Sequence, residues 1–308
     1  MAEIVVCEFM DEAIARDGFH GRDLLFDPAL VDDPDRLLAA VKDAKALIVR
    51  NRTQVRGALL EAAPALKVVG RLGVGLDNID LQACKARGVE VCPASGANDL
   101  SVAEYVVTAA MMLRRSAWMS TDAVAGGEWP RNRLIGRELS GATLGLVGLG
   151  AIARETAARA VALGMMVIAY DPYLPSDDPR WKGTKNVSFS DVLHRSDVVS
   201  LHTPLTDETR HLLGEDAFRV MKPGAVLVNA ARGGIVDEAA LAAALKEGRL
   251  GGAALDVFET EPLTAEAGEK FKGLPNILLT PHIAGVTAES NVRVSRVTVE
   301  NVLRVLDA

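Results

Sequence analysis

The sequence has little cysteine, and the residues present do not form a recognisable set. Cys7, Cys84 and Cys92 lie far apart and lack both C-x-x-C spacing and histidines at the spacing of a zinc site. A metal or redox role is therefore not expected, and no metal ligand is assigned. We expect these thiols to be small core residues.

Long apolar runs and basic runs are also missing. No window of 18 uninterrupted apolar residues occurs, and the opening MAEIVVCEFM has no basic segment followed by a long apolar stretch. The net charge of -7, without any run of basic residues, provides no electrostatic footprint for nucleic acid or for an anionic membrane. We expect a cytoplasmic protein whose partners are neither nucleic acid nor membrane.

What the sequence does contain is a regular alternation of short apolar runs and helix-like segments. At 308 residues, with 49% hydrophobic and 24% charged content, the chain is long for one core, which favours two domains. The strand-like runs of the first part are 3–9, 46–50, 67–71 and 89–93. The alternation restarts at TLGLVGLG and continues to NILLTPH. This pattern predicts an α/β fold with two doubly wound parallel sheets.

Two longer helices are predicted outside this alternation. SVAE places Glu104 three residues after Ser101, the pattern of a capped helix start, and the apolar periodicity persists to Trp118. This helix could bridge two domains or build a subunit interface. The final segment, Thr287 to Ala308, carries apolar residues on a polar background and is typical of an amphipathic helix. We expect it to pack near the first unit.

A glycine-rich loop opens the second unit. Gly148, Gly150 and Ala153 form a G-x-G-x-x-A pattern directly after the strand-like run 143–147 and directly before a helix-like segment. Such a loop lets a pyrophosphate approach the backbone and the N-terminus of the helix. Asp171 follows 21 residues after Gly150, where a carboxylate accepts from both ribose hydroxyls, which favours NAD over NADP. The alternative is a plain glycine turn with a solvated Asp171.

Charged side chains follow three later strands of this unit. Arg232 lies just beyond one apolar run, Asp256 and Glu261 beyond the next, and His282 beyond the last. Carboxyl ends of parallel strands line the ligand crevice, so these residues are expected to meet there. A guanidinium that binds a carboxylate and an imidazole that donates a proton suit hydride transfer to a 2-oxo acid. Glu261 is the natural partner that favours the imidazolium and fixes which nitrogen faces the substrate.

Each of these residues also has an ordinary interpretation: a solvated arginine, a turn glutamate or a satisfied histidine. Among the other histidines, His202 lies at a strand end and is expected to line the cofactor crevice, with Thr203 and Pro204 covering the nicotinamide side. Three histidines lie away from strand ends, in a loop, on a helix surface and before an apolar pair: His20, His194 and His211.

At this point the sequence resembles the D-2-hydroxyacid dehydrogenases, in particular their phosphoglycerate and sulfolactate dehydrogenase-like branch. The matching motifs run along the whole chain: GRLGVGLDNID, SVAEYV, GLVGLGAIA, AYDP, LHTPLTDETRHLL, NAARGGIVDEAAL, ALDVFETEPL and LTPHIAG. The resemblance implies an NAD-dependent enzyme with two Rossmann-like domains separated by an active-site cleft. It further implies a substrate domain of residues 1–98 plus 285–308, an NAD-binding domain of residues 99–284, and a homodimer joined through the cofactor domains.

The same resemblance implies roles for individual residues. Arg232, Glu261 and His282 would be the catalytic residues, and Asp256 would meet the nicotinamide carboxamide. The backbone around Val74 and Gly75 would cradle the substrate carboxylate. The full set expected at the cofactor is Gly148, Gly150, Ala151, Ile152, Asp171, His202, Thr203, Pro204, Ala230, Asp256 and Gly285. Ala153 stands where most members of the family carry glycine, a change that the loop tolerates.

The substrate is less well defined by the sequence. Arg50 and Arg52 follow a strand of the first unit, where phosphoglycerate dehydrogenases present a similar arginine-rich turn, so a second anion on the substrate is expected. The alternative is that one or both arginines lie in solvent. The chain ends soon after its last helix, so no regulatory extension is expected. 3-Sulfolactate and 3-phosphoglycerate both fit.

Three other functions remain open from the sequence. A glyoxylate or hydroxypyruvate reductase would need no second cation. A sensor or corepressor would bind NADH without turnover, and it predicts interaction tails that the chain lacks. A formate dehydrogenase would not use a glutamate–histidine pair, and Glu261 argues against it.

Overall fold

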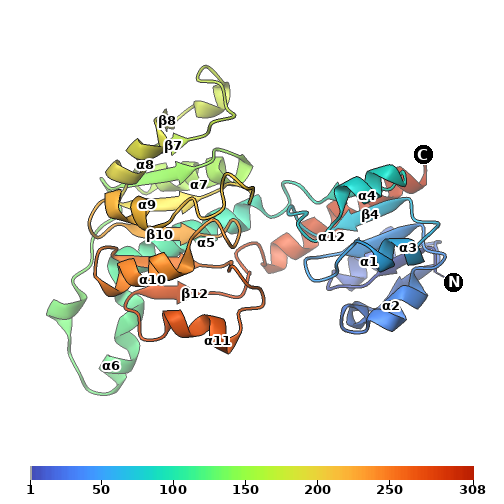
Figure 1. Ribbon diagram of the computed structural model, residues 1–308, viewed down its shortest axis with the longest axis horizontal. Coiled ribbons are helices and arrows are strands. Elements are labelled where there is room, and N and C mark those ends of the chain that lie inside the picture. Colours follow the sequence, from blue (N-terminus) through green and yellow to red (C-terminus); the bar gives the residue numbers. More distant parts are fainter. Residues whose placement is uncertain (1) are drawn as a thin grey trace. The chain divides into compact units, whose positions relative to one another are not determined.

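Two parallel β-sheets organise the computed structural model, which describes residues 2–308 (Figure 1). Contacts divide the chain into a first unit of residues 1–98 and 286–308 and a second unit of residues 99–285. The expected division placed Gly285 with the chain ends, and the contacts place it in the second unit. The predicted fold class, α/β with two doubly wound parallel sheets, is confirmed.

The sheet of the first unit has the strand order β2-β1-β3-β4-β5, and all its pairs are parallel. Its strands are β1 (Ile4–Val6), β2 (Leu24–Phe26), β3 (Ala46–Val49), β4 (Val68–Arg71) and β5 (Glu90–Pro93). The central strands β1, β3 and β4 are fully buried because helices cover both faces, which explains their continuous apolar runs. β2, a half-buried edge strand of three residues, was not predicted from the sequence.

Six helices of the described chain surround this sheet. They are α1 (Glu12–Gly18), η1 (Pro28–Asp32), α2 (Pro34–Ala40), α3 (Ala58–Ala62), α4 (Leu81–Ala86) and α12 (Ala288–Leu306). The last helix returns to the first unit as expected and is capped by Thr287, which exchanges hydrogen bonds with Ser290. Its buried face includes Val294, Val299 and Val302.

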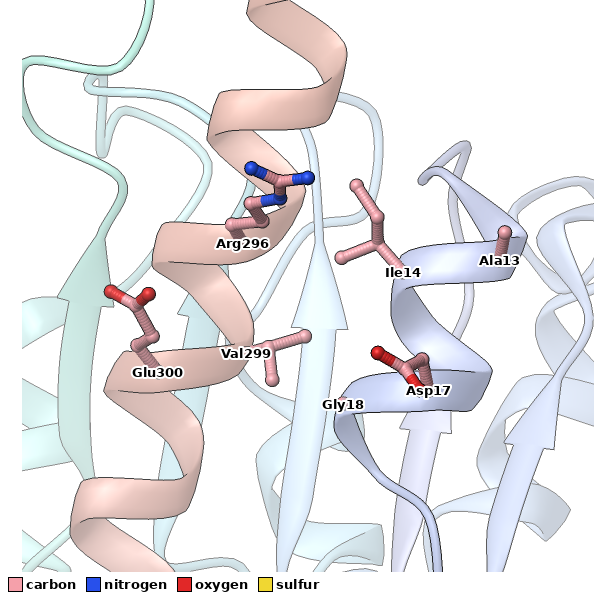
Figure 2. Close-up of a pocket in the computed structure, with 7 residues that line it drawn as sticks. All are labelled: Ala13, Ile14, Asp17, Gly18, Arg296, Val299 and Glu300. Atoms are coloured by element: carbon pink, nitrogen blue, oxygen red, sulfur yellow. The ribbon is translucent and has the colours of Figure 1, made fainter.

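Close packing joins α1 to α12. Figure 2 shows Gly18 on α1 opposite Val299 on α12, and a Cβ at position 18 would lie 2.5 Å from a Val299 methyl group. Beside this contact the two helices form a groove that is also lined by Asp17, Arg296 and Glu300. None of the site residues expected from the sequence lines the groove, so it serves helix packing in our interpretation.

The sheet of the second unit has the order β12-β11-β10-β9-β6-β7-β8, again with parallel pairs. Its strands are β6 (Thr143–Val147), β7 (Met166–Tyr170), β8 (Lys185–Asn186), β9 (Val198–Leu201), β10 (Val226–Asn229), β11 (Gly252–Leu255) and β12 (Ile277–Leu279). The strand order reverses between β6 and β9, and the carboxyl ends of two such strands form the usual ligand crevice of an open α/β sheet.

Helices cover both faces of this second sheet (Figure 1). They are α5 (Asp99–Arg115), η2 (Ala117–Ser120), α6 (Thr121–Ala125), η3 (Arg131–Leu134), α7 (Ala151–Ala162), η4 (Pro179–Trp181), α8 (Phe189–Arg195), α9 (Glu215–Val220), α10 (Glu238–Lys246), α11 (Ala265–Gly268) and η5 (Glu269–Phe271). Among residues 2–308, none of the helices has the length and apolar character that a bilayer span requires.

The long helix α5 differs from its predicted bounds. It begins at Asp99, so Ser101 is buried within its first turn, and the predicted serine cap is wrong. It ends at Arg115 because Ser116 adopts a left-handed backbone with φ of 52°, and Trp118 belongs to the short helix η2. The three cysteines are buried thiols, and burial raises the pKa of Cys7 to about 12.

Candidate active site

The loop after β6 has the backbone conformation that its glycines predict. Gly148 has a φ of 92° and donates its N–H to the carbonyl of Tyr170 over 2.7 Å. A Cβ at this position would lie 2.6 Å from the carbonyl oxygen of His202, at the end of the neighbouring strand β9. Only glycine accommodates both the positive φ and this close approach. The loop therefore lies at the point where the strand order reverses.

The N-terminus of α7 offers backbone donors next to this loop. Gly150 is the N-cap residue and supplies no capping side chain, and a Cβ there would meet nothing within 4 Å. Ala151 and Ile152 begin the helix, whose first N–H groups have no partner in the helix itself. Ala153 is fully buried in the core, which explains why a small residue is needed.

Asp171 holds the loop from the end of β7. Its carboxylate accepts the N–H of Leu149 over 2.9 Å and the N–H of Tyr173 over 3.0 Å. An ionised carboxylate has about four acceptor positions, so two remain for the hydroxyls of a ribose. The open N-terminus of α7, the space at Gly150 and this carboxylate fit an NAD molecule. Such a cofactor would accept a hydride in its oxidised form and donate one in its reduced form.

The residues after β9 complete this side of the crevice. His202 Nε2 lies 3.0 Å from the hydroxyl of the buried Ser200, and burial lowers the pKa of His202 to about 4, so its imidazole is neutral near pH 7. The buried Thr203 hydroxyl has no hydrogen-bond partner among the described residues, while Pro204 is exposed. An unpartnered buried hydroxyl beside the glycine loop is suited to a bound polar group.

Asn229 fixes the backbone that carries Arg232. The Asn229 side chain is 1% exposed, donates to the carbonyl of Arg232 over 2.9 Å and accepts the N–H of Ala231 over 3.1 Å. The Arg232 guanidinium donates to the carbonyl of Ala231 over 2.5 Å. Ala230, also expected at the cofactor, is partly buried in the same turn. The loop after β10 is thus rigidly shaped by one buried amide.

Glu261 and His282 form a direct pair. Nδ1 of His282 lies 2.7 Å from Oε2 of Glu261, and the other Glu261 oxygen accepts the N–H of Phe258 over 2.9 Å. The His282 side chain is 38% exposed, and its Nε2 makes no hydrogen bond within residues 2–308. Glu261 therefore binds the Nδ1 of His282, and the Nε2 of the ring is left to face a ligand.

The pair keeps Glu261 ionised. Burial alone would raise the pKa of the Glu261 carboxyl. The hydrogen bond and charge of His282, the N–H of Phe258 and the charge of Arg232 outweigh this effect and lower its pKa below the ordinary value. Arg232, Glu261 and His282, which follow three different strands, therefore influence one another electrostatically, as their positions at neighbouring strand ends predict.

A buried carboxylate holds the backbone on both sides of His282. Asp256 is 1% exposed and accepts the N–H groups of Ile283 and Ala284 over 2.8 Å each, together with the hydroxyl of Thr280 over 2.6 Å. His282 itself has a φ of 56°, an unusual conformation for a non-glycine residue. Its N–H donates to the carbonyl of Asp256 over 2.8 Å. These bonds stabilise the strained backbone that aims the imidazole.

Tyr105 extends this hydrogen-bond chain into α5. Its hydroxyl lies 2.6 Å from that of Thr280, and since Thr280 donates to Asp256, Tyr105 is the donor. Burial raises the pKa of Asp256, which the Thr280 hydroxyl and the two backbone N–H groups oppose. Three internal donors leave about one acceptor position on Asp256, which a carboxamide could use. Its expected contact with nicotinamide remains a prediction, as does that of Gly285, which follows this clamp.

The arginines of the first unit have different surroundings. Glu8 is 4% exposed, and its carboxylate accepts the backbone N–H groups of Arg50 (2.9 Å), Arg52 (3.2 Å) and Thr53 (2.9 Å), which fixes the turn. The Arg52 guanidinium pairs with Asp32. Its cation is therefore already matched within the chain.

Arg50 is held by neutral groups instead. Its guanidinium donates to the side-chain oxygen of Asn291 over 3.2 Å and lies 5.7 Å from the centre of the Phe9 ring. Val74 and Gly75 lie in the loop after β4, and Val74 is 40% exposed. Arg50 is the better candidate for an anion because its guanidinium has no carboxylate paired with it among the described ion pairs.

Several residues that shape the site were not predicted from the sequence: Glu8, Tyr105, Asn229 and Thr280. Asn229 directly precedes the AARGG motif and Thr280 lies inside LTPH, so their positions were a usable signal. The partners of Glu8 and Tyr105 lie 42 or more and 175 residues away in the chain, and no local pattern indicates them.

Comparisons with known proteins identify the family that this sequence resembles. The family described as "D-isomer specific 2-hydroxyacid dehydrogenase, NAD binding domain" matches residues 107–284. The (S)-sulfolactate dehydrogenase of Chromohalobacter salexigens is 53% identical over 307 residues, which cover 99% of both chains. The D-3-phosphoglycerate dehydrogenase of Archaeoglobus fulgidus is 41% identical over 269 residues, which cover 87% of this chain and 51% of that protein.

A solved structure extends the likeness to both units. The crystal structure of D-lactate dehydrogenase from Aquifex aeolicus, complexed with NAD and lactic acid, has a TM-score of 0.87 at 30% identity. It covers 99% of this chain and 95% of that chain. The similarity therefore includes both parallel sheets as well as the segment matched by the family.

The Asp256 clamp gives a first prediction. Thr280→Val removes one of the donors to a buried carboxylate, and an unsatisfied buried acceptor costs about 1–3 kcal/mol of unfolding free energy. The raised pKa of Asp256 gives the sign of the pH dependence: the loss is full at neutral pH and shrinks as falling pH protonates this carboxyl. Urea denaturation at several pH values measures it. Tyr105→Phe, which leaves the Thr280 bond to Asp256 intact, should cost less, and equal losses for both variants would contradict the clamp.

Proposed function

This chain belongs to the D-isomer-specific 2-hydroxyacid dehydrogenase family and is an NAD-dependent oxidoreductase that interconverts a 2-hydroxy acid and its 2-oxo acid, and we propose that Arg232, Glu261 and His282 carry this reaction. The observation that carries the proposal is the 2.7 Å pair between Glu261 and His282, with the second imidazole nitrogen left open. Arg232 lies close enough to lower the pKa of Glu261.

For the direction of reduction, NADH when bound would provide the hydride that the carbonyl carbon accepts. Arg232 would bind the substrate carboxylate and polarise the carbonyl, because a guanidinium forks onto planar anions. The backbone at Val74 and Gly75 would cradle the same carboxylate. His282 Nε2 would donate a proton to the carbonyl oxygen, while Glu261 holds Nδ1 and stabilises the imidazolium. In the oxidative direction His282 would accept the proton from the hydroxyl group.

The cofactor set extends from the glycine loop to the clamp at Asp256. We assign the pyrophosphate to Gly148, Gly150 and the first N–H groups of α7, and the ribose hydroxyls to Asp171. His202, Thr203 and Pro204 would line the nicotinamide side, where a neutral His202 avoids an unpaired buried cation. Ala230, Asp256 and Gly285 would complete it.

For the substrate we propose a 2-hydroxy acid with a second anionic group, of which 3-sulfolactate is the first choice. Arg50 supplies the cation, because no carboxylate of residues 2–308 forms an ion pair with its guanidinium, whereas Arg52 pairs with Asp32. The 53% identity to an (S)-sulfolactate dehydrogenase supports the sulfonate over a phosphate. The test is a screen of 3-sulfolactate, 3-phosphoglycerate, glycerate, lactate and malate with NAD. Equal turnover of lactate and 3-sulfolactate would contradict the proposal that the substrate carries a second anionic group.

We further propose a homodimer joined through the second unit. The segment 119–135 exposes large apolar side chains, including Trp129 at 76% and Ile135 at 78%, beside the half-exposed Met119 and Val124. Apolar groups gathered on one surface segment favour a protein contact. A second copy is the proposed partner, in the cytoplasm, where the buried free cysteines stay reduced.

The proposed proton donor gives the second prediction. His282→Asn should lower turnover by about 10²- to 10⁴-fold, the usual contribution of a positioned acid, and should leave NADH binding intact. Steady-state kinetics and NADH fluorescence titration measure the two effects. The exposed His194 on α8 provides a matched control, and His194→Asn should change neither value. Undiminished turnover in His282→Asn would show that His282 is not the proton donor.

The two arginines give the third prediction. Arg50→Ala should raise KM for 3-sulfolactate and 3-phosphoglycerate far more than for lactate, because only the former substrates carry a distal anion. Arg52→Ala is the matched control and should have the smaller effect, since its guanidinium is paired with Asp32. The measurement is the KM of each substrate for the wild type and for both variants. An equal change for all substrates in Arg50→Ala would contradict a second-anion site.

The exposed apolar segment gives the fourth prediction. The double variant Trp129→Asp/Ile135→Asp should shift the mass measured by light scattering from dimer to monomer, because charges on the contact disfavour association. Tyr173→Ser removes a comparably exposed aromatic at 86% outside this segment and should remain dimeric. A wild-type monomer at micromolar concentration would overturn the proposal.

A further inference from the structure

A buried carboxylate outside the proposed catalytic set lies at the start of α10. Glu238 is 3% exposed, although it directly follows the N-cap residue Asp237. Its Oε2 accepts from the ammonium group of Lys270 over 2.8 Å, and Lys270 comes from η5. An acid this deeply buried is expensive unless it is paired and hydrogen-bonded. Its second oxygen is bonded as well, to the backbone of another loop.

Glu238 and Glu259 bind each other's backbone. Oε1 of Glu238 accepts the N–H of Glu259 over 2.7 Å, and Oε1 of Glu259 accepts the N–H of Glu238 over 3.2 Å. The same Glu259 oxygen lies 3.1 Å from Nε2 of His211. Lys270 therefore faces this pair on one side and the imidazole of His211 on the other. Two separate loops are joined by reciprocal hydrogen bonds.

These loops are the ones that deliver two of the proposed catalytic residues. The loop after β10 contains Arg232 and runs into Glu238, and the loop after β11 contains Glu259 and Glu261. The two backbones also touch directly, since a Cβ on Gly233 would lie 1.7 Å from the carbonyl oxygen of Phe258. The N–H of Phe258 is the one that holds Glu261. A shift at Glu259 would therefore displace Glu261 relative to Arg232.

We propose that Glu238, neutralised by Lys270, is a positioning residue that sets the register between the Arg232 loop and the Glu261 loop and so holds Glu261 against His282. The inference rests on the proposed catalytic roles of these residues. Glu238 touches no reacting atom and acts through Glu259. Among residues 2–308, the charged groups that act on this pair or its backbone support are Glu261, Asp256 and Arg232, and Glu238 is bonded to the loop that carries Glu261.

The test compares Glu238→Gln, Lys270→Met and the double variant Glu238→Gln/Lys270→Met in the full chain. Lys270→Met leaves the buried carboxylate without its cation, and Glu238→Gln leaves the ammonium without its anion. The double variant is neutral and keeps an oxygen for the Glu259 N–H. Glu247→Gln changes an exposed acid just after the same helix and is the matched control.

For each single variant we expect kcat for 2-oxo acid reduction to fall by about 10- to 10²-fold, the loss typical of a misplaced catalytic group, with KM for NADH unchanged. The pH at which reduction falls to half on the alkaline side should move downward, because a displaced Glu261 stabilises the imidazolium less. The double variant should recover both values towards wild type, and Glu247→Gln should match wild type.

A contrary result is equally specific. If the single variants lose stability in urea but keep the wild-type kcat and the same alkaline midpoint, the pair is purely structural and the inference fails. If one single variant does not fold, the other single variant decides: a lowered kcat with a downward midpoint supports the positioning role, whereas wild-type kcat and midpoint overturn it. Full turnover in His282→Asn would instead refute the proposed catalytic roles, so the two failures are distinguishable.

Discussion

The bonds between Asp256 and the backbone around His282 are the interaction on which the site depends. A histidine with a φ of 56° needs external support, because that region is sparsely populated by residues with a side chain. Asp256 supplies it from the end of the neighbouring strand by accepting the N–H groups of Ile283 and Ala284. The backbone that carries the imidazole is thus fixed by sheet geometry and one buried carboxylate, and Glu261 then orients the ring through its Nδ1.

Two acids five residues apart take opposite electrostatic roles. Burial dominates at Asp256 and raises its pKa, because most of its partners are uncharged N–H and O–H groups. At Glu261 the imidazole and the guanidinium outweigh burial and lower the pKa. Opposite shifts in neighbouring titratable groups typically separate their tasks. Glu261 is suited to support a charged imidazole, and Asp256 to hold backbone and neutral amide donors.

Sequence patterns predicted the features that depend on local backbone geometry and on positions at strand ends. Gly148 was identifiable because positive φ and close approach demand glycine, and Glu261 and His282 could be expected to meet because parallel strands end on one edge of a sheet. Ser101 was misassigned as a cap because the helix gains one more half-turn at Asp99. The pairing of Arg52 with Asp32 depends on a tertiary contact across 20 residues, which no residue pattern indicates.

The same reasoning explains why the polar connections between loops escaped prediction. Glu238 appears in the sequence as a good first-turn acid of a helix, a role that would leave it in solvent. Burial gives Glu238 a different role, because a desolvated carboxylate needs a cation and hydrogen-bond donors. Lys270 supplies the cation and the N–H of Glu259 supplies a donor, and both lie on other segments. Propensity and periodicity describe a residue within its own element. The register between the loops that carry Arg232 and Glu261 is set by contacts that only the folded chain brings together.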